Sequence, residues 1–210
     1  MKIPYSQALN FLKDGDILLF KGKGFISWMI KTYSYGEYSH VGLLDMSNDI
    51  PMCCEMREFK GGRCVSLTSQ IEKIGKKIHQ IDVFRPASVI KHDIISKEDG
   101  QFIAQKVEKR LTKQIRRSIV LCMLKLTGTK YSWRNIFSMI KHYIPIFRLF
   151  KAKIQDNEER KLHVCSTAVC FCLRTQYEDP VPFLPDHMVT PSDLSRSPLL
   201  KYQFTIEKDS

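Results

Sequence analysis

The first half of the chain alternates short apolar runs with turn-forming residues, a pattern that predicts a sheet of short strands. These runs are bounded by Gly, Asp, Asn or Pro, and each has the length of a typical strand. We expect strands over 17–20, 38–44, 52–59 and 79–84, with a further extended segment over 64–67. Two other stretches carry apolar residues at helical spacing, and short helices are expected over 4–12 and 25–32.

The second half has a mainly helical pattern. Ser96 followed by Asp99 resembles a capping box, and the apolar periodicity after it predicts one or two helices as far as Leu126. A basic, aromatic-rich helical stretch follows over 131–150. A helix is then expected from Val164-Cys165-Ser166 to about Thr175, another from Thr190-Pro191-Ser192-Asp193, and a last strand over 199–206. The whole pattern predicts an α+β fold in which helices pack on one side of a small antiparallel sheet.

Length and composition limit the protein class. A chain of 210 residues buries one sizeable core, so we expect a single domain over 1–210. We find no secretory signal and no apolar run near the roughly 20 residues that span a bilayer, which predicts a cytoplasmic protein, with peripheral membrane contact left open. The seven cysteines have neither disulfide-like nor zinc-ligand spacing. They predict free thiols in a reducing compartment and no metal or other cofactor.

The charge is strongly positive and uneven. The net charge is +11, and residues 106–161 contain fifteen Lys or Arg against four acidic residues. Such a stretch can attract nucleic acid or an anionic membrane surface, but a set of solvated helix faces is the preferred explanation on sequence alone. Because the sequence has no nucleic-acid-binding motif, a nucleic-acid partner is not expected.

Cys165 is the first candidate for chemistry. A thiol attacks as its thiolate, which a helix N-terminus and a neighbouring imidazole both favour. Cys165 stands where a helix is predicted to begin, whereas Cys170 and Cys172 lie further along the same helix. The alternative is an inert core residue, since free cysteine is among the most buried residue types.

His40 is the candidate base for this thiol. It lies near the start of a predicted strand, and the competing histidines are His79, His92, His142, His163 and His187. An imidazole needs an orienting polar group, and Glu55 on the next predicted strand faces His40 across a hairpin. Asp45 and Glu58 remain open as alternatives to Glu55.

Taken together and in order, these residues resemble the permuted NlpC/P60 proteins, and within them the YiiX/YebB-like branch. The matching pieces, which extend from about residue 13 to about residue 196, are Gly15-Asp16-Ile17-Leu18, Ser39-His40-Val41-Gly42, Glu55, Arg85-Pro86, Tyr131, Cys165-Ser166 and Thr190-Pro191-Ser192-Asp193-Leu194. The resemblance implies a circularly permuted papain-like fold. In it Cys165 is the nucleophile, His40 the base and general acid, and Glu55 the group that orients the imidazole.

The same resemblance implies a cysteine hydrolase or acyltransferase that acts through an acyl-enzyme on an amide, ester or thioester. The substrate would be a peptide or an acyl lipid. Tyr38 and Tyr131 would line the cleft, and Asp16 and Asp193 would be structural. A helical, basic and aromatic insert over about 131–161 departs from the family pattern, and we interpret it as a lid or an anionic-membrane contact. The alternative function is a non-catalytic binding module of the same fold that uses its basic face for an anionic membrane or nucleic acid.

Overall fold

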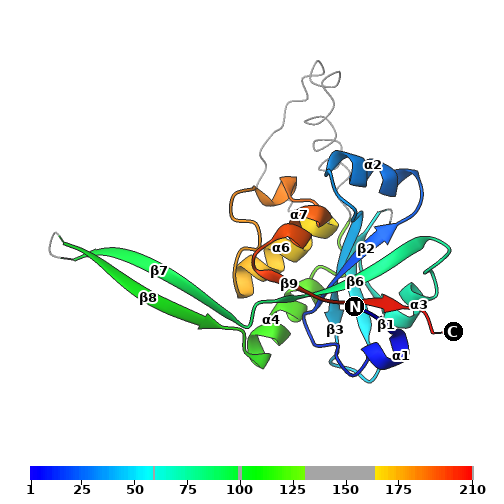
Figure 1. Ribbon diagram of the computed structural model, residues 1–210, viewed down its shortest axis with the longest axis horizontal. Coiled ribbons are helices and arrows are strands. Elements are labelled where there is room, and N and C mark those ends of the chain that lie inside the picture. The colour runs from blue at the N-terminus through cyan, green and yellow to red at the C-terminus, as the bar shows by residue number, and fades with distance from the viewer. Residues whose placement is uncertain (59, 99–100, 131–163, 210) are drawn as a thin grey trace, which may run out of the picture.

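A seven-stranded sheet lies at the centre of the computed structural model, which describes residues 1–58, 60–98, 101–130 and 164–209 (Figure 1). The strand order is β1-β9-β6-β2-β3-β4-β5, and only the β1–β9 pairing in this sheet is parallel. The strands are β1 (Lys2–Pro4), β2 (Ile17–Gly22), β3 (His40–Asp45), β4 (Met52–Arg57), β5 (Gly61–Ser66), β6 (Ile78–Pro86) and β9 (Leu200–Glu207).

The sheet is buried on both faces. Successive residues of its central strand β2 point to opposite sides, and each side lies in an apolar cluster. In β2, Ile17 and Leu19 belong to one apolar cluster, whereas Leu18 and Phe20 belong to another. The first cluster is covered by α4 (Lys113–Leu124), α6 (Cys165–Gln176) and α7 (Pro191–Arg196), and the second by α1 (Tyr5–Ala8) and α3 (Leu67–Ile71). The prediction of an α+β fold is confirmed. The prediction that the helices pack on one side of the sheet is wrong, because helices cover both faces.

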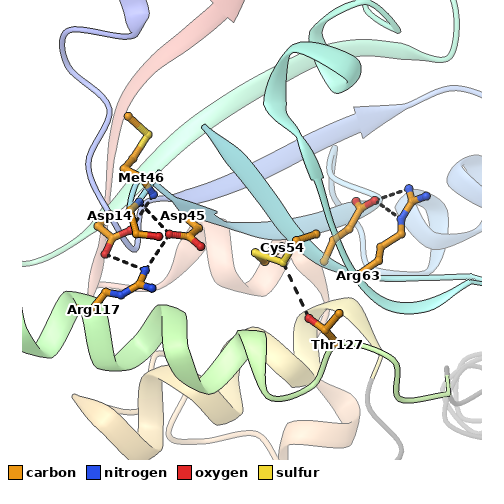
Figure 2. Close-up of a disulfide and its surroundings, with 10 residues drawn as sticks. Asp14, Asp45, Met46, Cys54, Arg63, Arg117 and Thr127 are labelled. Atoms are coloured by element: carbon orange, nitrogen blue, oxygen red, sulfur yellow. Dashed lines mark hydrogen bonds and ion pairs between the residues drawn. A yellow bond between two sulfur atoms is a disulfide. The ribbon is translucent and has the colours of Figure 1, made fainter. Parts of the chain in front are cut away.

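Helix α6 is buried along most of its length, packed against α4 and the strand β3. Its first turns consist of small and medium side chains, which allow close approach to the sheet. Helix α4 is fixed to the sheet by Arg117, whose guanidinium lies 2.8 Å from Asp45 Oδ1 and 3.7 Å from Asp14 Oδ2 (Figure 2). Helix α6 therefore packs between the sheet and a helix that is itself bound to the sheet.

The helices predicted from Ser96 to Leu126 are wrong in their first half. Strands β7 (Val89–Glu98) and β8 (Gln101–Arg110) form an antiparallel ribbon that projects from the body (Figure 1). The register of the ribbon runs from Val89 opposite Arg110 to Glu98 opposite Gln101. The helix begins only at α4, where the Thr112 side chain accepts a hydrogen bond from the Ile115 amide.

Several other elements lie where the sequence predicts them. Helix α2 (Phe25–Tyr33) and helix α6 match their expected ranges within two residues, and a short 3₁₀ helix, η2 (Asp186–Met188), precedes α7. Helix α7 begins at the predicted Thr190 and forms a capping box: Asp193 N–H donates to the Thr190 hydroxyl, and Thr190 N–H donates to Asp193. The helical stretch predicted over 131–150 lies outside the described residues, as does the rest of the proposed insert. Within the described part, no helix is both long and apolar enough to cross a membrane.

Candidate active site

His40 and Glu55 meet across the hairpin of β3 and β4. Gly42 is the register partner of Glu55, and His40 lies two residues before Gly42, on the same face of the strand. His40 Nε2 is 2.6 Å from Glu55 Oε2, and the two residues are only 3% and 1% exposed. The structure therefore brings together the two residues that the sequence places on adjacent strands.

The second oxygen of Glu55 is also occupied. Arg63, directly opposite Glu55 on β5, donates from Nε to Oε1 at 2.9 Å and makes a further hydrogen bond from Nη2 (Figure 2). Gln70 of α3 donates to the same oxygen at 3.2 Å, and Lys73 in turn donates to the Gln70 amide oxygen. Sequence reasoning missed Arg63 and Gln70, because the β4–β5 register and the position of α3 are set by tertiary packing.

These neighbours fix the charges of the pair. Burial lowers the pKa of His40, but the charges of Glu55 and then Cys165, with the hydrogen bond to Glu55, outweigh it and raise the pKa to about 10. Burial likewise raises the pKa of Glu55, but His40, Arg57 and Arg63 bring it down to about 2. Near neutral pH the pair is therefore an imidazolium and a carboxylate.

Cys165 is the first residue of α6 and is 4% exposed. Its N-cap residue, Val164, supplies no side-chain hydrogen bond, so the first N–H groups of the helix are not used by a cap. The start of the helix is held by Ser166, which donates to the Val189 carbonyl, and by Thr167, which donates to the Asp186 carbonyl. A buried sulfur thus lies at the positive end of a fixed helix.

The second ring nitrogen of His40, Nδ1, is the one available to this sulfur, because Nε2 is bound to Glu55. His40 Nδ1 is buried and makes no hydrogen bond of ordinary length with a described residue. The charge of Cys165 nevertheless contributes to the raised pKa of His40, so the sulfur lies near the ring. Glu55 occupies Nε2, so Nδ1 is the position from which His40 can exchange a proton with Cys165.

The other free thiols differ in their surroundings. Burial raises the pKa of Cys53 and of Cys170. Cys122 of α4 is partly exposed, and its hydrogen bond with Cys172 lowers its pKa to about 6, against the effect of burial. No histidine contributes to that shift. Cys122 is thus a second candidate for a reactive thiol, and sequence reasoning missed it because its contact with Cys172 joins two separate helices.

Two cysteines are not free, and the prediction of free thiols is wrong for them. Cys54 on β4 and Cys64 on β5 are register partners, with Cα atoms 4.1 Å apart, and form a disulfide (Figure 2). Directly opposed residues of antiparallel strands point to the same side of the sheet, which brings the two sulfurs together. The sequence spacing does not disclose the pairing, because it depends on the register of the hairpin.

The other residues singled out from the sequence are not part of this group. The Tyr38 hydroxyl donates to Asp82 Oδ2 at 2.7 Å, and burial and Asp82 together raise the pKa of Tyr38. Asp16 accepts two hydrogen bonds from Arg85, at 2.7 and 2.6 Å, which gives a structural reason for the Arg85-Pro86 match. Tyr131 and His163 lie outside the described residues, and His79 is exposed.

Comparison with known proteins supplies a fold neighbour. No protein-family model matches the chain, and no curated protein sequence matches it. Among solved structures, the metalloprotein yiiX from Escherichia coli O157:H7, DUF1105, is similar with a TM-score of 0.57. The two chains share a fold. The alignment covers 94% of this chain and 97% of that one, at 16% sequence identity. The resemblance to the YiiX-like branch is thus supported at the level of the fold.

The name of that neighbour raises the question of a metal site. Within the described ranges, no group of three or more His, Cys, Asp or Glu side chains is arranged so that it could hold a metal ion. Cys165, His40 and Glu55 do not form such a group, because Glu55 is already bound to His40 and Arg63. The described donors of this chain therefore do not fit a metal centre.

Proposed function

We propose that the protein is a cysteine hydrolase or acyltransferase with Cys165 as nucleophile, His40 as general acid and base, and Glu55 as the group that orients His40. One observation carries the proposal: a buried imidazole is bound to a carboxylate at 2.6 Å and its other nitrogen is left for a thiol at a helix start. Perturbed, buried groups of this kind gather at catalytic sites. The circularly permuted papain-like fold of the NlpC/P60 proteins is part of the same proposal.

The chemistry follows from the positions of these groups. The imidazolium of His40 lies beside the thiolate of Cys165, and this thiolate attacks the carbonyl carbon of an amide, ester or thioester. The first N–H groups of α6 stabilise the oxyanion. His40 then gives the proton to the leaving group as the carbon–leaving-group bond breaks. In the second half, the neutral His40 takes a proton from water or an acceptor as that molecule attacks the acyl carbon. The carbon–sulfur bond then breaks, which releases the acyl group and restores the imidazolium and the thiolate.

Arg63 and Gln70 are positioning residues in this scheme. They hold Glu55 in the orientation in which it bonds His40 Nε2, which keeps Nδ1 on the side of Cys165. Because the carboxylate keeps His40 positively charged, the arrangement favours an imidazolium beside a thiolate. A peptide and an acyl lipid are both substrates that this mechanism would accept.

Site-resolved alkylation with a small haloacetamide, followed by mass spectrometry from about pH 5 to about pH 9, tests the dyad. We expect Cys165 to react faster than Cys53 and Cys170 and to stay reactive at the acidic end. His40→Ala should slow Cys165 by about tenfold or more in mildly acid solution, and His79→Ala, an exposed histidine, should have no effect. Cys122 serves as the internal standard, because its reactivity should not depend on His40.

Turnover is tested separately with peptide amides and acyl-lipid thioesters or esters, with Cys165→Ala as the control. An acyl group found on Cys165 by mass spectrometry would support the proposal. An inert Cys165, or one whose reactivity does not change in His40→Ala, would overturn it. The non-catalytic binding module would then account better for the fold.

A further inference from the structure

Helix α2 has an unusual relation to the rest of the molecule. None of its nine residues is buried, although six of them are apolar or aromatic. Phe25, Ile26 and Trp28 are 71%, 37% and 57% exposed, and the Phe25 and Trp28 rings stack with centroids 5.8 Å apart. Large exposed aromatic side chains gathered on one short helix commonly mark an interaction surface.

The helix is attached to the body through its small and polar side. Ser27 packs so closely on Gly22 that a Cβ at this glycine would come 2.5 Å from the serine hydroxyl. Lys31 donates to the Gly22 carbonyl, and Ser34, just after the helix, hydrogen-bonds Ser192 of α7. The aromatic side of α2 therefore points away from the protein, in the reverse of the usual amphipathic arrangement.

Three lysines without an acidic partner among the described residues lie next to this aromatic side. The Lys23 side chain donates to the Gly75 carbonyl, and its backbone amide bonds to the Lys77 carbonyl, so the 75–77 turn lies beside the start of α2. Lys76 and Lys77 are exposed, and neither they nor Lys23 forms an ion pair with a described residue. Aromatic side chains flanked by free lysines complement an anionic lipid surface, which offers both a hydrocarbon layer and negative headgroups.

We propose that α2, with Phe25, Ile26 and Trp28, is an interfacial docking helix for an anionic membrane, and that Lys23, Lys76 and Lys77 bind the lipid headgroups. The surface borders the candidate active site. Ser39, which precedes His40, accepts from the Gly22 amide, and His40 lies against Phe20 of the strand that leads to α2. Docking would therefore present the His40 end of the sheet to the membrane. It does not require Cys165 to be catalytic.

Flotation of the full chain with vesicles tests the proposal, using phosphatidylcholine alone and phosphatidylcholine mixed with phosphatidylglycerol. We expect binding to the mixed vesicles only, weakened by added salt. Phe25→Ser/Trp28→Ser should weaken it at least about tenfold. Phe183→Ser is the matched control, because Phe183 is 94% exposed elsewhere and its replacement should change nothing. Lys76→Glu/Lys77→Glu should lower binding to mixed vesicles about tenfold. Lys106→Glu, on strand β8, is the control and should leave this binding unchanged.

The tryptophan gives a second measurement. The chain has two tryptophans, and Trp133→Phe leaves Trp28 as the only one. Its fluorescence should shift to the blue on mixed vesicles and be quenched by brominated lipid chains. Normal binding by Cys165→Ala would separate docking from catalysis. The absence of vesicle binding, or binding that survives the Phe25→Ser/Trp28→Ser change, would overturn the proposal. The proposal would also be overturned if the protein proved to be a dimer that the Phe25→Ser/Trp28→Ser change splits into monomers without weakening vesicle binding.

Discussion

Glu55→Gln removes one charge from the centre of the candidate site while keeping the shape of the side chain. The wild-type carboxylate has its pKa lowered from 4.5 to about 2 on folding, so its ionisation stabilises the folded protein. A shift of this size corresponds to about 3 kcal/mol. A lowered acid pKa contributes stability that is fully present above the unfolded value and is lost as the pH falls through the folded value. The deficit of the variant should therefore be about 3 kcal/mol near pH 6 and roughly 1 kcal/mol near pH 3.

The partner titration gives the other limit. The pKa of His40 is raised from 6.5 to about 10, so its contribution is complete below pH 6.5 and is lost as the pH rises through 10. The two shifts share one interaction, and the shift of His40 is larger because Cys165 adds to it. Urea unfolding of both proteins at several pH values measures the deficit, and NMR of His40 follows its titration directly. Equal stabilities near pH 6, or a deficit that does not shrink toward pH 3, would refute this reasoning.

Three further predictions concern other parts of the fold. Arg85→Met should cost about 3 kcal/mol in urea unfolding, because it leaves the fully buried Asp16 without its bidentate partner. Burial raises the pKa of Asp16, so that deficit should shrink in acid, and an unchanged midpoint would contradict the pairing. Thr190→Ala should cost about 1 kcal/mol by removing the capping box of α7, and Ser195→Ala, outside the box, should cost less. Peptide mapping without reductant should recover Cys54 and Cys64 in linked peptides, and Cys54→Ala/Cys64→Ala should lower stability by about 2 to 3 kcal/mol; two freely alkylated thiols would rule out the bond.

The sequence predicts those parts of the molecule that depend on local pattern. The strand with His40, the helix start at Cys165 and the Thr190 cap follow from apolar runs and capping residues close together in the chain. Local signals also misled us at Ser96, because Ser-x-x-Asp fits a helix cap, whereas Asp-Gly at 99–100 equally favours a two-residue hairpin turn.

Features that require register or packing between distant segments could not be predicted. Arg63 reaches Glu55, and Cys54 reaches Cys64, only because β4 and β5 pair in one particular register. The contact of Cys122 with Cys172 depends on how α4 lies on α6. In each case the side chains are ordinary in the sequence, and their environment is made by the fold.

The separation of the candidate triad along the chain has a consequence for how the protein folds. His40 and Glu55 are fifteen residues apart on one hairpin, so their contact closes a short loop and can form early. Cys165 joins them only after α6 has docked on β3, which requires contacts between distant parts of the sequence. A partly folded chain would then contain the His40–Glu55 pair while Cys165 was still an ordinary thiol. If Cys165 is the proposed nucleophile, it would gain its base only when α6 docks, which would protect an incomplete chain from reacting with its surroundings.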